Sequence, residues 1–370
     1  MLHPVVTVTP NPALDLTWVA EGVVPGGSHR VDAARVRAGG KGINVARVLH
    51  GQGLEAVAVT TVGGAVGTEF AADLVASGVP HTLVPVTADT RRSAAVYDET
   101  AADTMIFNER GTAPQADEWE QLIEAVEAEV VGATAEAAAA VLVISGSLPP
   151  GIGAEQLRAL IRVGQSHRVP VIVDTSGPLL LAAAEAGADL LKPNRDELHA
   201  ATGEPDPLRG MAHLMRLGAG AVLCSLGAEG MLLGTASDPM ELRGQRARRA
   251  RLTTALVGNP TGAGDAAVAA AASLAACGAA LGDTAVLRRA TLWSAAAVLM
   301  PLAGEISPRH TELEQQLVLD VVTADPASAG PVVEPDLEPV PVAPPKPHPK
   351  PGPLPGPGLH PRIDLEGAHA

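Results

Sequence analysis

The chain has 370 residues, enough for one large domain or two smaller ones, and a formal net charge of −15. This charge argues against nucleic acid and anionic membranes as main partners. Hydrophobic residues make up 46% of the chain but aromatic residues only 2%, so we expect a large core built from Ala, Val and Leu.

The cysteines and the N-terminus bear on where the protein resides. Cys224 and Cys277 have neither CxxC spacing nor a nearby pair of histidines, which argues against a disulfide framework and against a metal site. The N-terminal stretch lacks a basic segment followed by an apolar one, so we expect no signal peptide. The Ala-rich runs are too short and too weakly apolar to span a bilayer. We therefore expect a cytoplasmic protein.

The first part of the chain predicts strands and helices with a smaller sheet beside them. A buried strand over residues 4–9 is followed by a turn, TPNPALD, that ends at Asp15. Short extended pieces at 16–19 and in VDAARVRAGG are expected in a small sheet outside the main body. A strand over 56–62 precedes a turn and a helix. The glycines of that turn do not meet the GxGxxG pattern, so we interpret them as an ordinary strand-to-helix turn.

A glycine-rich loop, GGKG, opens the helix expected over residues 39–53. It is not a P-loop, because Gly42 follows Lys41 where Ser or Thr would ligate Mg²⁺. Lys41 and Lys192 are the two lysines before the C-terminal tail; elsewhere in that part of the chain the long basic residues are arginines. Because Lys and Arg differ where a compact charge is needed, this pattern favours a functional role for both lysines. The loop is either a tight turn or a ligand site. Asn44, a poor residue for a helix interior, favours a contact with a ligand hydroxyl.

Residues 90–111 read as a hairpin in which RSAAVYD and TMIFN are the strands. Arg91 and Arg92 stand at its base. They form either an anion clamp or a solvated surface pair. A helix is expected over 115–138.

From residue 141 strands alternate with helices, which implies a parallel sheet covered on both faces. Ligands of such sheets bind beyond the carboxyl ends of the strands. The glycine-rich or polar strings GSLPPG, DTSG, KPNRDE and SLGAEG stand at those ends. In KPNRDE, Asn194 and Glu197 are three residues apart at a helix start, so they either form a capping box or orient a hydrated Mg²⁺.

The stretch GNPTGAGDAAVAAAASLAACGAA places a short loop before an Ala-rich helix. Unpaired N–H groups, a positive dipole end and small residues make this loop suited to phosphate. Asp265 then either caps the helix or acts beside the phosphate, as a metal ligand or as a base. A helix follows over 283–300, and 308–323 closes the fold. Residues 325–370 are Pro-rich and expected to be a disordered tail.

Together, TPNPALD, GGKGINVARVL, ISGSLPPG, KPNRDEL, SLGAEG and TGAGDAAVA resemble the PfkB, or ribokinase-like, carbohydrate kinases. The resemblance lies closest to the phosphosugar branch of 1-phosphofructokinase, tagatose-6-phosphate kinase and the minor 6-phosphofructokinase. It implies a doubly wound, mostly parallel α/β domain over residues 1–324, with a small β-sheet lid from about 14–37 and 88–109. It also implies ATP and Mg²⁺ as co-substrates, and a homodimer paired through the lid edge.

The resemblance also implies residue roles. Asp265 is the expected catalytic base. The backbone from Gly262 through Ala263 and Gly264 to Asp265 is the expected anion hole. The expected sugar contacts are Asp15, Gly39, Gly40, Lys41 and Asn44, with Arg91 binding the phosphate that the sugar already carries. The expected nucleotide contacts are Lys192, Asn194, Ser225, Gly227 and Asn259. Glu197 matches a motif that handles Mg²⁺ through water.

Three residues depart from the family pattern: Pro260 before the GAGD string, Ser93 in the lid, and Arg110 in place of a common proline. They bear on the identity of the substrate more than on the chemistry. We predict conversion of fructose 1-phosphate and ATP to fructose 1,6-bisphosphate and ADP. Tagatose-6-phosphate or 6-phosphofructokinase activity is the first alternative. A non-catalytic sugar-phosphate sensor on a kinase scaffold is the second. A nicotinamide-dependent dehydrogenase is disfavoured because its glycine fingerprint is missing.

Overall fold

A ten-stranded sheet forms the centre of the protein, in the order β14-β13-β12-β11-β10-β9-β8-β1-β4-β5. The structure, a computed structural model, describes residues 4–101, 103–136 and 140–324. The strands from β11 to β5 run parallel, whereas β12, β13 and β14 are antiparallel additions at one edge. In chain order the strands are β1 Val5–Thr9, β4 Ala56–Val62, β5 His81–Pro85, β8 Val141–Ser145, β9 Val171–Asp174, β10 Leu190–Leu191, β11 Ala221–Ser225, β12 Met231–Thr235, β13 Arg246–Leu252 and β14 Leu317–Thr323.

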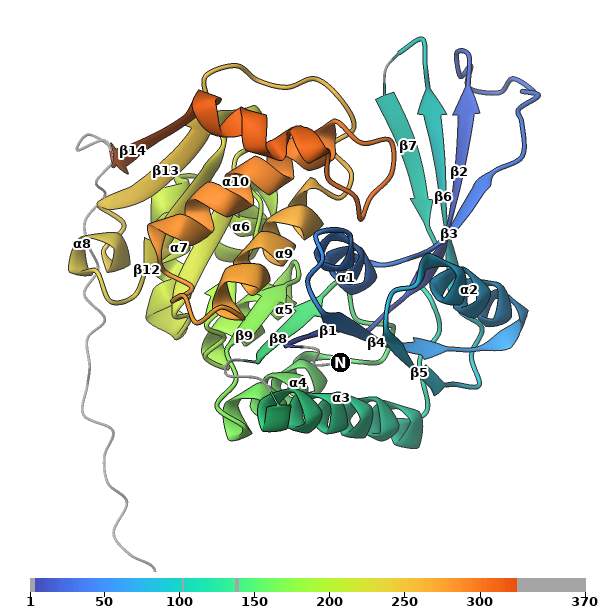
Figure 1. The fold of residues 1–370 in the computed structure, drawn as a ribbon, viewed down its shortest axis with the longest axis horizontal. Coiled ribbons are helices and arrows are strands. Elements are labelled where there is room, and N and C mark those ends of the chain that lie inside the picture. Colours follow the sequence, from blue (N-terminus) through green and yellow to red (C-terminus); the bar gives the residue numbers. More distant parts are fainter. Residues whose placement is uncertain (1–3, 102, 137–139, 325–370) are drawn as a thin grey trace, which may run out of the picture. The chain divides into compact units, whose positions relative to one another are not determined.

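Helices cover both faces of this sheet (Figure 1). One face is covered by α1 Lys41–Gly51, α2 Gly64–Ser77, α9 Ala263–Ala275 and α10 Thr284–Val298. The other is covered by α3 Ala116–Glu136, α4 Ala154–Ser166, α5 Pro178–Glu185, α6 Arg195–Thr202 and α7 Pro207–Leu217. Short helices are α8 Pro239–Leu242 and the 3₁₀ segments η1 Gly227–Glu229 and η2 Pro308–Gln316. The mostly parallel, doubly wound α/β class predicted from the sequence is confirmed.

A second sheet of four strands lies apart from the first, in the order β3-β2-β6-β7 (Figure 1). Its strands are β2 Ala13–Ala20, β3 Arg35–Gly39, β6 Arg91–Asp98 and β7 Asp103–Asn108. This is the small sheet predicted from the off-core segments, and we call it the lid. β2 pairs in parallel with β6 and antiparallel with β3, while β6 and β7 form the predicted hairpin.

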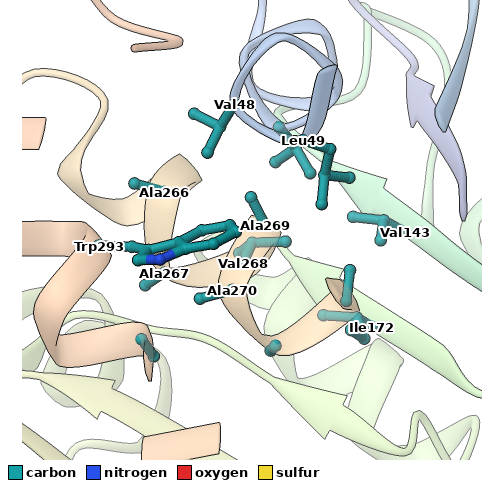
Figure 2. Close-up of a cluster of buried hydrophobic side chains, with 14 of the residues drawn as sticks. Val48, Leu49, Val143, Ile172, Ala266, Ala267, Val268, Ala269, Ala270 and Trp293 are labelled. Carbon is teal, nitrogen blue, oxygen red and sulfur yellow. The ribbon is translucent and has the colours of Figure 1, made fainter. Parts of the chain in front are cut away.

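Helix α9 is buried along most of its length, which fixes the position of its N-terminus. Ala266 through Ala272 are all fully buried. Figure 2 shows this run between α1, which contributes Val48 and Leu49, and Trp293 of α10, close to Val143 and Ile172 of the sheet. Because alanine is small, α9 packs closely against both helices. The predicted core of Ala, Val and Leu is confirmed, and it places the start of α9 at the site described below.

Several elements are absent from the prediction. β5, α7, α8 and β13 were not assigned, although Asp206 before Pro207 is an ordinary start signal for α7. β13 was not predicted because four of its seven residues are arginines, which do not give the apolar pattern of a buried strand. Within the described residues, no helix combines the length and the apolar character needed to cross a bilayer. The expected tail over 325–370 lies outside the described residues.

Candidate active site

One cavity of about 1380 Å³ extends from the carboxyl ends of the parallel strands to the lid. Its lining includes residues at the end of four neighbouring strands or directly after it, among them Gly146, Asp174, Lys192 and Ser225. The lid contributes residues of β2, β6 and β7. The predicted gathering of the four polar strings at one edge of the sheet is therefore confirmed.

The loop before α9 exposes main-chain N–H groups to this cavity. Gly262 is the N-cap residue, has a left-handed φ of 85°, and caps the helix without a side-chain hydrogen bond. The N–H groups of Gly264 and Asp265 have no hydrogen-bond partner within the described part of the chain. Lys192 lies over the loop, because a Cβ built on Gly264 would be 3.1 Å from its Nζ. Unpaired N–H groups and an ammonium group make this an anion site.

Asp265 lies in the first turn of α9 and does not cap it. Its side chain is 5% exposed, and Oδ2 accepts a hydrogen bond of 2.8 Å from Nδ2 of Asn44. Burial, with a smaller contribution from the charge of Asp174, raises the pKa of Asp265 to about 6. Of the two interpretations of this residue, the capping one is wrong. A carboxylate with a raised pKa is suited to accept a proton near neutral pH.

Two lysines flank a buried carboxylate behind the anion site. Lys41 Nζ lies 3.3 Å and Lys192 Nζ 3.8 Å from Oδ1 of Asp174, whose Oδ2 accepts a hydrogen bond from Ser145. Burial raises the pKa of Asp174, but the two lysines outweigh it and hold the pKa below its usual value. Asp174 in turn raises the pKa of Lys41. Lys41 therefore remains charged in the cavity.

The lid places Asp15 and Arg91 on the same side of the cavity. Gly39 pairs with Ala13 on the neighbouring strand, and a Cβ built on Gly39 would overlap the carboxylate of Asp15. Gly39 thus does not line the cavity but makes room for Asp15. Burial raises the pKa of Asp15 to about 6, against the opposing charge of Arg91. Arg91 itself is held by bonds to the carbonyl oxygens of Asn11 and Glu109.

Asn194 and Glu197 form the predicted capping box at the start of α6. Asn194 Oδ1 accepts from the Glu197 N–H at 2.8 Å, and Glu197 Oε2 accepts from the Asn194 N–H at 2.9 Å. Both residues also line the cavity, and the other carboxylate oxygen of Glu197 lies 3.9 Å from Lys41 Nζ. The capping interpretation is confirmed, and it leaves Oε1 available to a ligand.

Besides Gly39, two residues singled out in the sequence do not line the cavity. The side chain of Asn259 donates to the Pro301 carbonyl at 3.1 Å and accepts from the Thr261 N–H at 3.0 Å, so it braces the anion loop. Arg92 is exposed, and its position in β6 alternates with that of Arg91.

Other lining residues were missed by sequence reasoning. Asp174 is the last residue of β9 and begins the DTSG string expected at this edge of the sheet, but the sequence analysis gave it no role of its own. Thr9 ends β1 in the same way, and its buried Oγ1 lacks a hydrogen-bond partner in the described structure. Asn11 donates to Ser147, which links the first turn to the loop after β8.

The amide loop, the buried acid beside it and the opposing lid define a small-molecule phosphotransferase. The pattern of the pfkB family of carbohydrate kinases matches residues 11–309, so the chain belongs to this family and is an ATP-dependent carbohydrate kinase. An ATP-dependent 6-phosphofructokinase isozyme 2 from Mycobacterium tuberculosis is 37% identical over 237 residues, 62% of this chain and 68% of that protein. A 1-phosphofructokinase from Rhodobacter capsulatus is 34% identical over 310 residues, 82% of this chain and 92% of that protein.

Solved structures of phosphofructokinase-2 from Escherichia coli are also similar. A tetrameric inhibited form and a complex with fructose-6-phosphate align with TM-scores of 0.74 and 0.73 and identities of 30% and 31%. Both alignments cover 85% of this chain and 99% of the other. The named relatives thus divide between two phosphofructokinase activities at similar identity.

Proposed function

We propose that this kinase phosphorylates a sugar that already carries a phosphate, with fructose 1-phosphate as the substrate and fructose 1,6-bisphosphate as the product. The observation that carries the proposal is the buried Asp265 beside unpaired N–H groups, in a cavity that Arg91 also lines. Phosphorylation of fructose 6-phosphate is the alternative favoured by the 6-phosphofructokinases among the relatives. Tagatose 6-phosphate is the third candidate substrate.

Asp265 is the proposed base. Its carboxylate takes the proton of the acceptor hydroxyl as that oxygen forms a bond to the terminal phosphorus of ATP, while the bond from phosphorus to the departing ADP oxygen breaks. Asn44 orients the carboxylate through its hydrogen bond to Oδ2. The N–H groups of Gly264 and Asp265 stabilise the charge on the transferring phosphoryl group, supported by Gly262 and Ala263 in the same loop.

The sugar is proposed to bind between the lid and α1. Asp15, Gly40, Lys41 and Asn44 line this end of the cavity and offer polar groups to its hydroxyls. Arg91 binds the phosphate that the sugar already carries, because a guanidinium matches phosphate with paired N–H donors. Gly39 contributes by leaving room for Asp15.

The nucleotide is proposed to bind at the ends of β10 and β11. Lys192, Asn194, Ser225 and Gly227 line that part of the cavity. Asn259 acts through the anion loop that it braces. The sequence predicted direct contact with the nucleotide for this residue.

Magnesium fits the donor set of this site only in its hydrated form. The described residues contain no group of three or more His, Cys, Asp or Glu side chains able to hold a metal. Mg²⁺ at kinase sites keeps several waters and uses one or two carboxylates together with phosphate oxygens. Glu197 is the carboxylate proposed to hold it through water, with Oε1 available. The ion would neutralise charge on the phosphates.

A homodimer through the lid edge is part of the proposal. β7 is an edge strand, and Phe107 on it is 65% exposed and Ile106 46% exposed. An exposed apolar edge strand favours pairing with a second chain. Analytical ultracentrifugation of the protein and of a Phe107→Lys variant tests this, and an unchanged dimer in the variant contradicts it. The cytoplasmic location expected from the sequence also stays a prediction.

Steady-state kinetics with ATP and a panel of fructose 1-phosphate, fructose 6-phosphate, tagatose 6-phosphate and fructose test the substrate. We expect the highest kcat/KM with fructose 1-phosphate. A higher value with another phosphosugar assigns the activity to that sugar instead. Binding of a phosphosugar without turnover of any sugar would identify a sensor and contradict the proposal.

A further inference from the structure

The base of the lid hairpin carries two arginines on one face. β6 and β7 pair antiparallel with Ser93 opposite Asn108, and a bond of 3.2 Å from the Glu109 N–H to the Arg92 carbonyl extends the ladder. Arg110 lies two residues beyond the end of β7, where the same register, if continued, would bring it opposite Arg91. Arg91 and Arg110 both line the cavity, as do Ser93 and Asn108 next to them.

The two guanidinium groups differ in how they are held. Arg91 Nε and Nη2 donate to the Asn11 carbonyl at 3.3 and 3.1 Å, and Nη1 donates to the Glu109 carbonyl at 2.9 Å. Arg110 is anchored through its backbone, because its carbonyl accepts from Nδ2 of Asn11 at 3.3 Å. Its exposed guanidinium has no hydrogen-bond or ion-pair partner among the residues that the structure describes. All five donors of Arg110 are therefore available to a ligand.

The charges around this pair favour an anion between them. Like charges directly opposite each other in a sheet are destabilising unless compensated. Glu109 also lines the cavity, but its Oε2 already accepts a hydrogen bond from the Arg92 N–H at 2.7 Å. Asp15 pairs with Ser93, one position further along the lid on the same face. The lid thus presents a cationic position beside an anionic one, a pattern suited to a ligand with a phosphate at one end and hydroxyls next to it.

We propose that Arg110 is a second phosphate-binding residue that acts with Arg91. The two guanidiniums would bind the phosphate that the substrate already carries, at the end remote from the hydroxyl that is phosphorylated, while Asp15 accepts hydrogen bonds from the hydroxyls. This inference rests on the proposed phosphosugar kinase function. It assigns the preference for a phosphorylated sugar to a pair of residues at the base of the lid rather than to Arg91 alone.

The chain provides a matched control for Arg110. Arg92 lies in the same hairpin and carries the same charge, but its side chain is exposed and does not line the cavity. A general electrostatic effect of removing one positive charge from the lid would therefore be the same for both arginines. A specific contact with the substrate phosphate would affect Arg110 only.

The test compares Arg110→Ala, Arg110→Lys and Arg92→Ala in steady-state kinetics, with the phosphosugar that the unmodified enzyme uses best and with fructose. For Arg110→Ala we expect KM for the phosphosugar to rise about 10- to 100-fold, as for loss of a charge-assisted hydrogen bond. The kcat, the KM for ATP and the kcat/KM for fructose stay within about twofold. In Arg110→Lys the KM for the phosphosugar should rise less than in Arg110→Ala, because lysine keeps the positive charge. In Arg92→Ala it should equal that of the unmodified enzyme.

Inorganic phosphate is a second probe that does not depend on turnover of a given sugar. Its inhibition constant against the phosphosugar should rise in Arg110→Ala and stay unchanged in Arg92→Ala. An unchanged KM for the phosphosugar in Arg110→Ala overturns the role of Arg110 and leaves the proposed function intact. An equal loss with fructose also overturns it, because that result indicates a structural role. If the unmodified enzyme prefers fructose to every phosphosugar, the result contradicts the proposed function itself, and with it the role of Arg110 that rests on that function.

Discussion

The start of α9 and the base of the lid hairpin serve one cavity by different physical means. At α9 the groups are main-chain N–H donors and the carboxylate of Asp265, which is 5% exposed and held by a packed, Ala-rich helix. At the hairpin they are long arginine side chains, of which that of Arg110 is exposed. Main-chain N–H groups stay the same when a residue is substituted, whereas exposed side chains change. We therefore infer that the start of α9 determines the reaction and that the base of the lid hairpin determines which substrate is bound.

The largest effect is expected for Asp265→Asn. Without a carboxylate to take the proton of the acceptor hydroxyl, kcat should fall by about 10²- to 10⁴-fold, the usual contribution of a general base. Binding of the phosphosugar and of ATP, followed by calorimetry, should change by only a few-fold. Asp283→Asn is the control, since Asp283 caps α10 and asparagine caps a helix equally well. A kcat near that of the unmodified enzyme would show that Asp265 is not the base.

A smaller but still large effect is expected when the anion loop is displaced. Gly262 and Gly278 have nearly the same left-handed φ, 85° and 84°, so alanine strains the backbone equally at both. A Cβ at Gly262 would lie 2.8 Å from the Cα of Ala303, whereas one at Gly278 would have nothing within 4 Å. We expect Gly262→Ala to lower kcat by about 10²-fold, as for loss of one anion-hole donor. Gly278→Ala should cost stability only, and equal kcat values for the two variants would contradict the role of the loop.

Displacement of Asp15 should change KM more than kcat. Alanine at Gly39 would collide with the Asp15 carboxylate, while the same change at Gly51 meets nothing within 4 Å. We expect KM for the sugar to rise about 10- to 100-fold in Gly39→Ala, the cost of losing a hydrogen bond to a charged group. Steady-state kinetics of both variants measures this. A normal KM in Gly39→Ala would mean that Asp15 does not hold the sugar.

The smallest expected effect is on stability. Because the pKa of Asp265 is raised to about 6 in the folded protein, the folded state binds more protons than the unfolded state between about pH 4 and pH 6. This carboxyl group therefore makes folding less favourable as the pH rises through that range. Asp265→Asn should raise the melting temperature by about 2–4 °C at pH 8 and leave it nearly unchanged at pH 4. A lower melting temperature at pH 8 would contradict the raised pKa.

Sequence reasoning recovered the framework because it depends on periodicity. The strand over 56–62, the helix after the GAGD string and the lid hairpin lie where they were predicted. β13 was missed because ion-pair partners outside the strand neutralise its arginines: Arg249 pairs with Asp320 of β14, and Arg248 pairs with Glu241 of α8.

The site was recovered unevenly for a similar reason. Motif residues such as Lys41, Asn44 and Asp265 do lie together in the cavity. The placement of Arg91 and Arg110 in one cavity depends on strand register, and the fit of Gly39 to Asp15 depends on close packing across two strands. Neither can be read from residue spacing alone.

The most direct test of the central claim is the pH dependence of the chemical step, measured by rapid quench after enzyme preincubated with saturating phosphosugar is mixed with saturating ATP. The rate in the unmodified enzyme and in Asp15→Asn should fall about tenfold per pH unit below about pH 6, as Asp265 becomes protonated. In Asp265→Asn the slow residual rate should be independent of pH over the same range. The same break near pH 6 in Asp265→Asn would contradict the assignment of Asp265 as the base.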